Sequence, residues 1–202
     1  MDNVKIKKHT DYSKLIEENK HYIIITVIYI LGLIAGTLIY KNLDTDALNK
    51  TLEKLLLSKD NTFLSIFVQK IITYFCVYIF TVVFALSVIG YPAINIIPFL
   101  CGFEIAVKLS YYYTLYNIKG LGYSLLLNAP EISAFMLIII FTVNQAGELS
   151  KKIFRSTFMK EQSEINNASH YLKIFCIYIL EIICVATVNS LVEYLLSSII
   201  TL

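Results

Sequence analysis

Ionisable and amide side chains interrupt several long apolar stretches of this chain, and their types and spacing are the ones that could support chemistry. Glu104 and Lys108 are four residues apart, so on a helix they share one face, with the acid before the base. The pair is predicted either to neutralise itself as a structural ion pair, or to line a polar cavity or bind a partner helix. Ionisable groups at bilayer depth are costly and usually face the interior of a bundle. We therefore expect an intramembrane polar cluster, which consists of Glu104, Lys108, Asn128, Pro130, Glu131, Glu181 and Asn189.

Two members of this cluster sit in distinctive local sequence. Pro130 followed by Glu131 is a favourable helix start, because proline suits the first helical position and an acid complements the helix dipole. Asn128 to Glu131 is therefore predicted to be either a kink with satisfied carbonyls or the break of a discontinuous helix, as in transporters. Glu181 has no partner within its own helix, so it is expected to pair with Lys108 across the bundle or to be protonated.

Signatures of catalysis, metal binding and cofactor binding are missing from the sequence. It contains no H-E-x-x-H, no G-x-S-x-G and no phosphate-binding glycine loop. All aspartates and histidines lie outside the apolar stretches, and the four cysteines lie inside them without a C-x-x-C pair. We therefore predict a protein that is not an enzyme, with no cofactor, no metal site and no structural disulfide.

The elements that must position the polar side chains are membrane spans. Hydrophobic residues make up 57% of the 202 residues, and the mean hydropathy is +0.67. The stretch from Tyr22 to Tyr40 carries no charge and reaches about 27 Å as a helix, close to the thickness of a bilayer core. Five spans are predicted, at about 22–40, 70–89, 98–116, 123–143 and 171–193, the fourth of them broken.

The predicted fold is an all-α, polytopic transmembrane helical bundle that forms one integral membrane domain over residues 1–202. The loop at 41–69 has leucines at helical spacing, which indicates a short amphipathic helix on the membrane surface or capping the bundle. Residues 90–98 are expected to be irregular or partly re-entrant. Gly32 and Gly36 form a G-x-x-x-G pattern, which either lets another helix approach closely or is a chance match.

Charge predicts the orientation and limits the partners. The net charge of +2 gives no reason to expect nucleic acid. With five spans, the N-terminal tail and the 144–170 linker share one side and hold nine Lys or Arg, whereas 41–70 holds five and Lys119 adds one more. This bias predicts a cytoplasmic N-terminus and an external C-terminus. The abundance of Lys, Ile, Asn and Tyr is typical of AT-rich bacterial genomes, which suggests a bacterial cytoplasmic membrane.

Three short motifs, together with the overall plan, resemble the stage II sporulation protein M family. Residues 120–134 resemble its glycine-entered helix with a proline-containing break before a glutamate, and residues 146–152 its alanine-glycine exit into a basic linker. Residues 98–102 resemble the entry to its third span. The sequence departs from many members at Leu126 and Leu127, where those members carry proline and histidine.

The resemblance implies a membrane scaffold that anchors peptidoglycan-degrading enzymes on the outer side during engulfment in sporulation. We therefore expect a non-enzymatic scaffold that recruits membrane or extracytoplasmic proteins such as cell-wall-remodelling hydrolases, with self-association left open. The alternative is a small transporter or permease subunit with a polar midplane site, which the broken span and the buried acids suggest.

Overall fold

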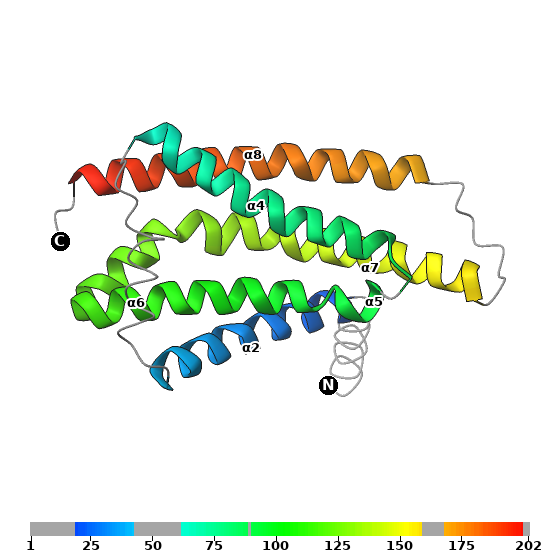
Figure 1. Ribbon diagram of the computed structural model, residues 1–202, viewed down its shortest axis with the longest axis horizontal. Helices are drawn as coiled ribbons and strands as arrows, with labels where there is room; N and C mark the ends of the chain where they lie inside the picture. The colour runs from blue at the N-terminus through cyan, green and yellow to red at the C-terminus, as the bar shows by residue number, and fades with distance from the viewer. Residues whose placement is uncertain (1–18, 43–61, 89, 159–167, 200–202) are drawn as a thin grey trace, which may run out of the picture.

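The computed structural model describes residues 19–42, 62–88, 90–158 and 168–199, and this part of the chain is entirely helical where it is regular. Within the described residues, five helices are long and apolar enough to cross a membrane, which confirms the predicted fold class. They lie side by side, roughly along one direction (Figure 1). The elements are α2 (Lys20–Asn42), α4 (Phe63–Leu86), α5 (Gly90–Ala93), α6 (Ile96–Leu127), the π-helix η1 (Glu131–Phe135), α7 (Met136–Phe158) and α8 (Ala168–Ile199).

Several boundaries differ from the predicted spans. The second span begins at Phe63, seven residues before its predicted start, and α7 continues to Phe158 through half of the predicted 144–170 linker. Hydropathy marks only the apolar part of a helix, whereas the backbone hydrogen bonds continue into polar residues at its ends. The amphipathic helix predicted within 41–69 falls mostly outside the described residues.

Residues 117–122, which lie between the predicted third and fourth spans, contain a kink at Asn117. This residue has a φ of 54° and a ψ of −139°, a positive-φ conformation close to that of type II′ turns, in which asparagine is one of the preferred residues. The chain then folds back as a short helical segment at one end of the bundle (Figure 1). We refer to this segment, residues 118–127, as the return segment. A Cβ at Gly120 would overlap the backbone carbonyl of Tyr112, so only glycine allows this close return.

The predicted irregular stretch at 90–98 contains a single helical turn, α5, followed by the start of α6. Pro98 lies in the first turn of α6, where its missing N–H breaks no intrahelical hydrogen bond. This stretch therefore joins two spans compactly.

Glycines bring α2 and α6 into close contact. A Cβ added to Gly32 would overlap the backbone of Phe99, and one added to Gly36 would come within 2.6 Å of the Phe103 carbonyl oxygen. From the other side, Gly102 of α6 lies against the backbone of α2. The structure thus places both glycines of the G-x-x-x-G pattern at a helix–helix interface, as small residues are in membrane bundles.

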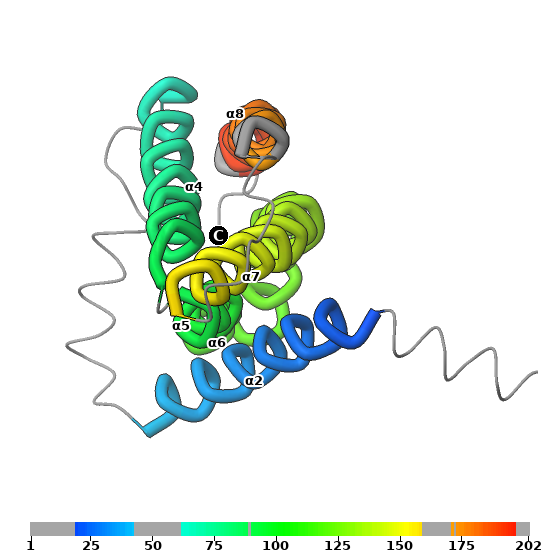
Figure 2. The backbone as a smooth tube through the Cα atoms, turned by 90° about the vertical axis from the view of Figure 1, so that its right-hand side faces the viewer, coloured from blue at the N-terminus to red at the C-terminus, as the bar shows by residue number. Residues whose placement is uncertain are grey.

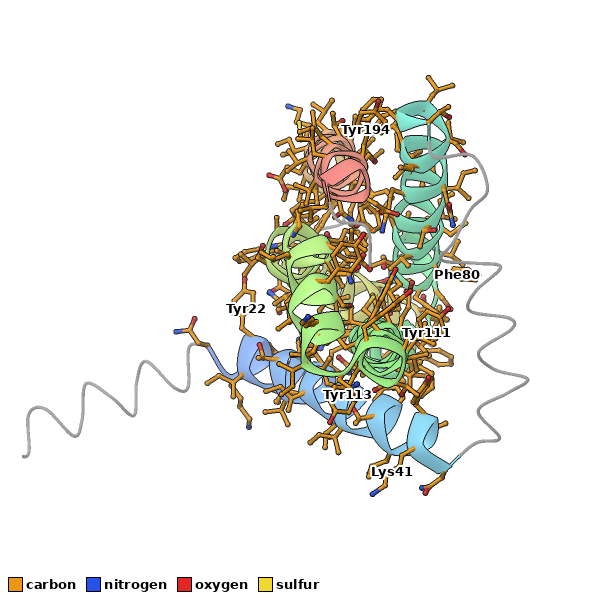
Figure 3. All side chains as sticks on the ribbon, turned by 90° about the vertical axis from the view of Figure 1, so that its left-hand side faces the viewer. Tyr22, Lys41, Phe80, Tyr111, Tyr113 and Tyr194 are labelled. Atoms are coloured by element: carbon orange, nitrogen blue, oxygen red, sulfur yellow. The ribbon has the colours of Figure 1, made fainter. Side chains whose placement is uncertain are left out.

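Helix α7 lies at the centre of the bundle, with α4 and α8 on one side of it and α6, followed by α2, on the other (Figure 2). Its buried residues include Ile139 and Ala146, which are fully buried. The outer faces of the bundle carry large apolar side chains, such as Phe80, which is 62% exposed and points outward from α4 (Figure 3). Such a surface is suited to acyl chains, because lipid removes the cost of exposing apolar area.

Candidate functional site

The centre of the site is an ion pair between α6 and η1. Lys108 Nζ lies 3.0 Å from Oε1 of Glu131 and 2.9 Å from Oε1 of Glu104. Glu131 is only 3% exposed, whereas the side chain of Glu104 is 43% exposed. The i, i+4 spacing predicted from the sequence thus forms an ion pair, and the same lysine also joins its helix to η1. One lysine therefore bridges two acids, one buried and one open to the surface.

A second lysine extends the cluster to two more helices. Lys70 Nζ, from α4, lies 3.7 Å from Oε2 of Glu131 and 3.1 Å from Oε2 of Glu193 on α8. We refer to these five side chains, Lys70, Glu104, Lys108, Glu131 and Glu193, as the ionic cluster. It links α4, α6, η1 and α8 by charge. If all five groups are ionised, three carboxylates face two ammonium groups, which leaves one negative charge unmatched.

Neutral side chains surround the ionic cluster. Asn189 of α8 donates a hydrogen bond of 2.6 Å from Nδ2 to the hydroxyl of Tyr74, and both residues are almost completely buried. The Tyr74 ring stacks on Phe135 of η1, with a centroid distance of 4.0 Å. Asn128 donates to the carbonyl oxygen of Ser124 at 2.8 Å, within the return segment. These contacts fix the neutral side chains on the buried side of the ionic cluster.

The local backbone at Glu131 deviates from an α-helix for an identifiable reason. Pro130 has no N–H, so the regular ladder is interrupted there, and the amide of Met136 reaches back to the carbonyl of Glu131 in a π-type hydrogen bond. The hydroxyl of Ser133 donates to the Ala129 carbonyl at 2.6 Å. A kink and a discontinuous helix were the two alternatives predicted here. The structure has a short break at Asn128, after which the chain is helical again and a wide turn carries Glu131 into the core.

A small cavity of about 70 Å³ lies within the site. A buried water needs roughly 10–15 Å³ of such space, so the cavity holds a few waters or one small ion and no larger solute. Its lining combines the ionic cluster with Gln69, Thr73, Tyr74, Tyr112, Leu127 and Asn128.

Glu181 lies apart from the cluster, which corrects the expectation that it pairs with Lys108. It is exposed on α8, and Lys108 is engaged by Glu104 and Glu131. Twelve residues separate Glu181 from Glu193, which is about 18 Å along a helix. Because α8 is apolar on nearly all faces, its sequence does not reveal which face is buried.

The predicted polar cluster did not include Lys70, Tyr74 and Glu193, which all line the site. Lys70 was predicted to be the first residue of the second span, at the membrane boundary, because that span was placed seven residues too late. Tyr74 is one of many tyrosines in the chain, and only its burial at 1% exposure distinguishes it. The i, i+4 spacing of Lys70 and Tyr74 was the one available signal, since it puts both side chains on one helix face.

Among the described residues there is no group of three or more His, Cys, Asp or Glu side chains arranged to hold a metal ion. The four cysteines are free thiols, of which Cys101 is buried. The chemistry that the site offers is therefore that of carboxylates and ammonium groups.

No protein-family model matches the chain, and neither a curated protein nor a solved structure matches it. The class that the fold defines is a polytopic helical membrane protein with five candidate spans.

Proposed function

We propose that the protein is a non-enzymatic membrane scaffold that recruits partner proteins. The proposal rests on how the charges of the ionic cluster are paired. Its charges are engaged with one another across four elements, around a cavity of about 70 Å³. Such an arrangement fixes helices relative to one another, and it leaves no room for a metabolite. A rigid bundle of this kind is suited to holding other proteins in place.

The resemblance to the stage II sporulation protein M family supplies the class of partner. It implies cell-wall-remodelling hydrolases on the outer side of a bacterial membrane, reached by the loop at 41–69. The motif at 120–134 supports it, because this stretch contains most of the return segment and the break before Glu131.

The test is co-purification of the full chain with the peptidoglycan hydrolases of the native host, from its membranes. Deletion of residues 44–57 is expected to abolish the association and leave the bundle intact. Glu181→Gln, on the exposed surface of α8, serves as the matched control and is expected to bind as the parent does. Unchanged hydrolase association after the deletion contradicts the scaffold proposal in this form.

The second candidate is a transporter or channel for a small cation or proton. One observation favours it: the ionic cluster has one unmatched carboxylate next to a cavity large enough for a single ion. Proteoliposomes that contain the parent, Glu131→Gln or Glu181→Gln would be compared for flux. Transport through the cluster requires that only Glu131→Gln loses flux, and equal flux in all three excludes this route.

A further inference from the structure

A shallow apolar groove of about 300 Å³ opens on the outer surface between α4 and α6. Its walls include Val77, Phe80, Ile97 and Leu100, and Glu104 lies at one end. Phe80 points away from the bundle on the same side (Figure 3). The groove therefore belongs to the surface that faces the lipid.

Glu104 lies deep in the bilayer. It is eight residues from the start of α6 and thirteen residues before the kink at Asn117, or about 12 Å and 20 Å along the helix. A bilayer core is about 30 Å thick, so this carboxyl is near its middle. Ionisable groups at that depth normally face the bundle interior. The side chain of Glu104, which is 43% exposed, departs from this rule, so we expect another molecule to cover it in the membrane.

The ion pair with Lys108 does not fully neutralise Glu104. Its Oε1 atom contacts Lys108, but Lys108 is shared with the deeply buried Glu131. The ionic cluster as a whole has one more carboxylate than ammonium group. Acyl chains fill an apolar groove but offer no hydrogen-bond donor and no positive charge. A covering helix with a basic side chain supplies both the apolar surface and the missing charge.

We propose that the α4–α6 groove binds a transmembrane helix of a partner protein, and that a Lys or Arg side chain of this helix pairs with Glu104. The volume of the groove, about 300 Å³, suits a few side chains of one helix. The proposal rests on the scaffold function and deepens it, because it assigns a membrane-embedded contact in addition to the loop at 41–69. It gives Glu104 a role in recognition, whereas Glu131 has a role in holding the bundle together.

The test is site-specific photo-crosslinking in native membranes, with a photoreactive amino acid at position 100, in the groove. Position 137 on α7 is the control, because Leu137 is similarly exposed (56% against 55%) but does not line the groove. We expect position 100 to crosslink to a transmembrane segment with a Lys or Arg within one turn of the crosslinked residue, and position 137 to crosslink to lipid. Glu104→Gln should lower the yield at position 100 about fivefold, the factor expected for one interhelical polar contact.

Removing the charge on the partner's side keeps the outcome independent of the folding of this chain. If the identified basic residue of the partner is changed to Gln, the yield should fall in the same way. Adducts only with lipid, adducts with a second copy of this chain, or adducts with a segment that has no basic residue overturn the proposal. Hydrolase association of the parent together with lipid-only adducts at position 100 refutes the groove contact alone. A specific adduct at position 100, together with hydrolase association that survives deletion of residues 44–57, refutes the loop contact alone.

Discussion

Replacing Lys108 by methionine removes the central cation of the ionic cluster while keeping a side chain of similar length. Lys108 is 3.0 Å from Glu131 and 2.9 Å from Glu104, and Glu131 is 3% exposed. Breaking a buried ion pair by removing one partner typically costs about 3–5 kcal/mol, because the other charge remains buried. Glu131 keeps Lys70 at 3.7 Å, which is a weaker contact, so we expect a loss near the lower limit, about 3 kcal/mol.

The measurement is reversible unfolding in mixed micelles of a mild detergent and dodecyl sulfate, followed by circular dichroism. Lys119→Met is the matched control, because Lys119 is exposed on the return segment, and exposed substitutions usually change stability by less than about 0.5 kcal/mol. The double variant Lys108→Met with Glu131→Leu should recover at least about 1 kcal/mol relative to Lys108→Met, since it no longer buries an unpaired acid. A loss for Lys108→Met equal to that of Lys119→Met would refute the reasoning, as would a double variant less stable than the single one.

Three further outcomes are expected. Gly36→Leu should destabilise the bundle and displace α2, because even a Cβ at this position comes within 2.6 Å of the Phe103 carbonyl oxygen, and cysteine crosslinking between α2 and α6 would report the displacement. Tyr74→Phe should lower the free energy of unfolding by about 1–3 kcal/mol in the same assay, because the Nδ2 group of Asn189 loses its acceptor. The Oδ1 atom of Asn189 already accepts no hydrogen bond from the described residues. A loss no larger than that of a surface substitution would contradict this expectation. Glu181→Gln should leave unfolding unchanged, and a large loss would show that Glu181 has a buried partner.

Much of the fold follows from composition along the chain. Uncharged stretches of about twenty residues have few alternatives to a membrane helix, so the number of spans was predictable. The first span was predicted to within two residues at each end, because charges or polar residues flank it. Polar residues continue the fourth span as a helix through 144–158, so the end predicted from hydropathy, at 143, came too early.

The candidate site was predictable only in part, for a geometric reason. Glu104 and Lys108 share a helix face by spacing alone, and Pro130 fixes a helix start at Glu131. Which residues of other helices meet them depends on how each helix is rotated about its axis. An almost uniformly apolar helix such as α8 gives no such information, so Glu181 was expected inside the bundle although it lies outside.

The ionic cluster implies that charged side chains of separate spans meet inside the membrane. Crosslinking in membranes tests this contact: cysteines replace Lys70 and Glu193 in a background without the four native cysteines, and a short bifunctional thiol reagent is added. The 3.1 Å contact between these side chains predicts efficient crosslinking of positions 70 and 193, and little between 70 and a cysteine at position 181, about 18 Å further along α8. Equal yields for the two pairs, or no product for 70 and 193, would contradict the claim.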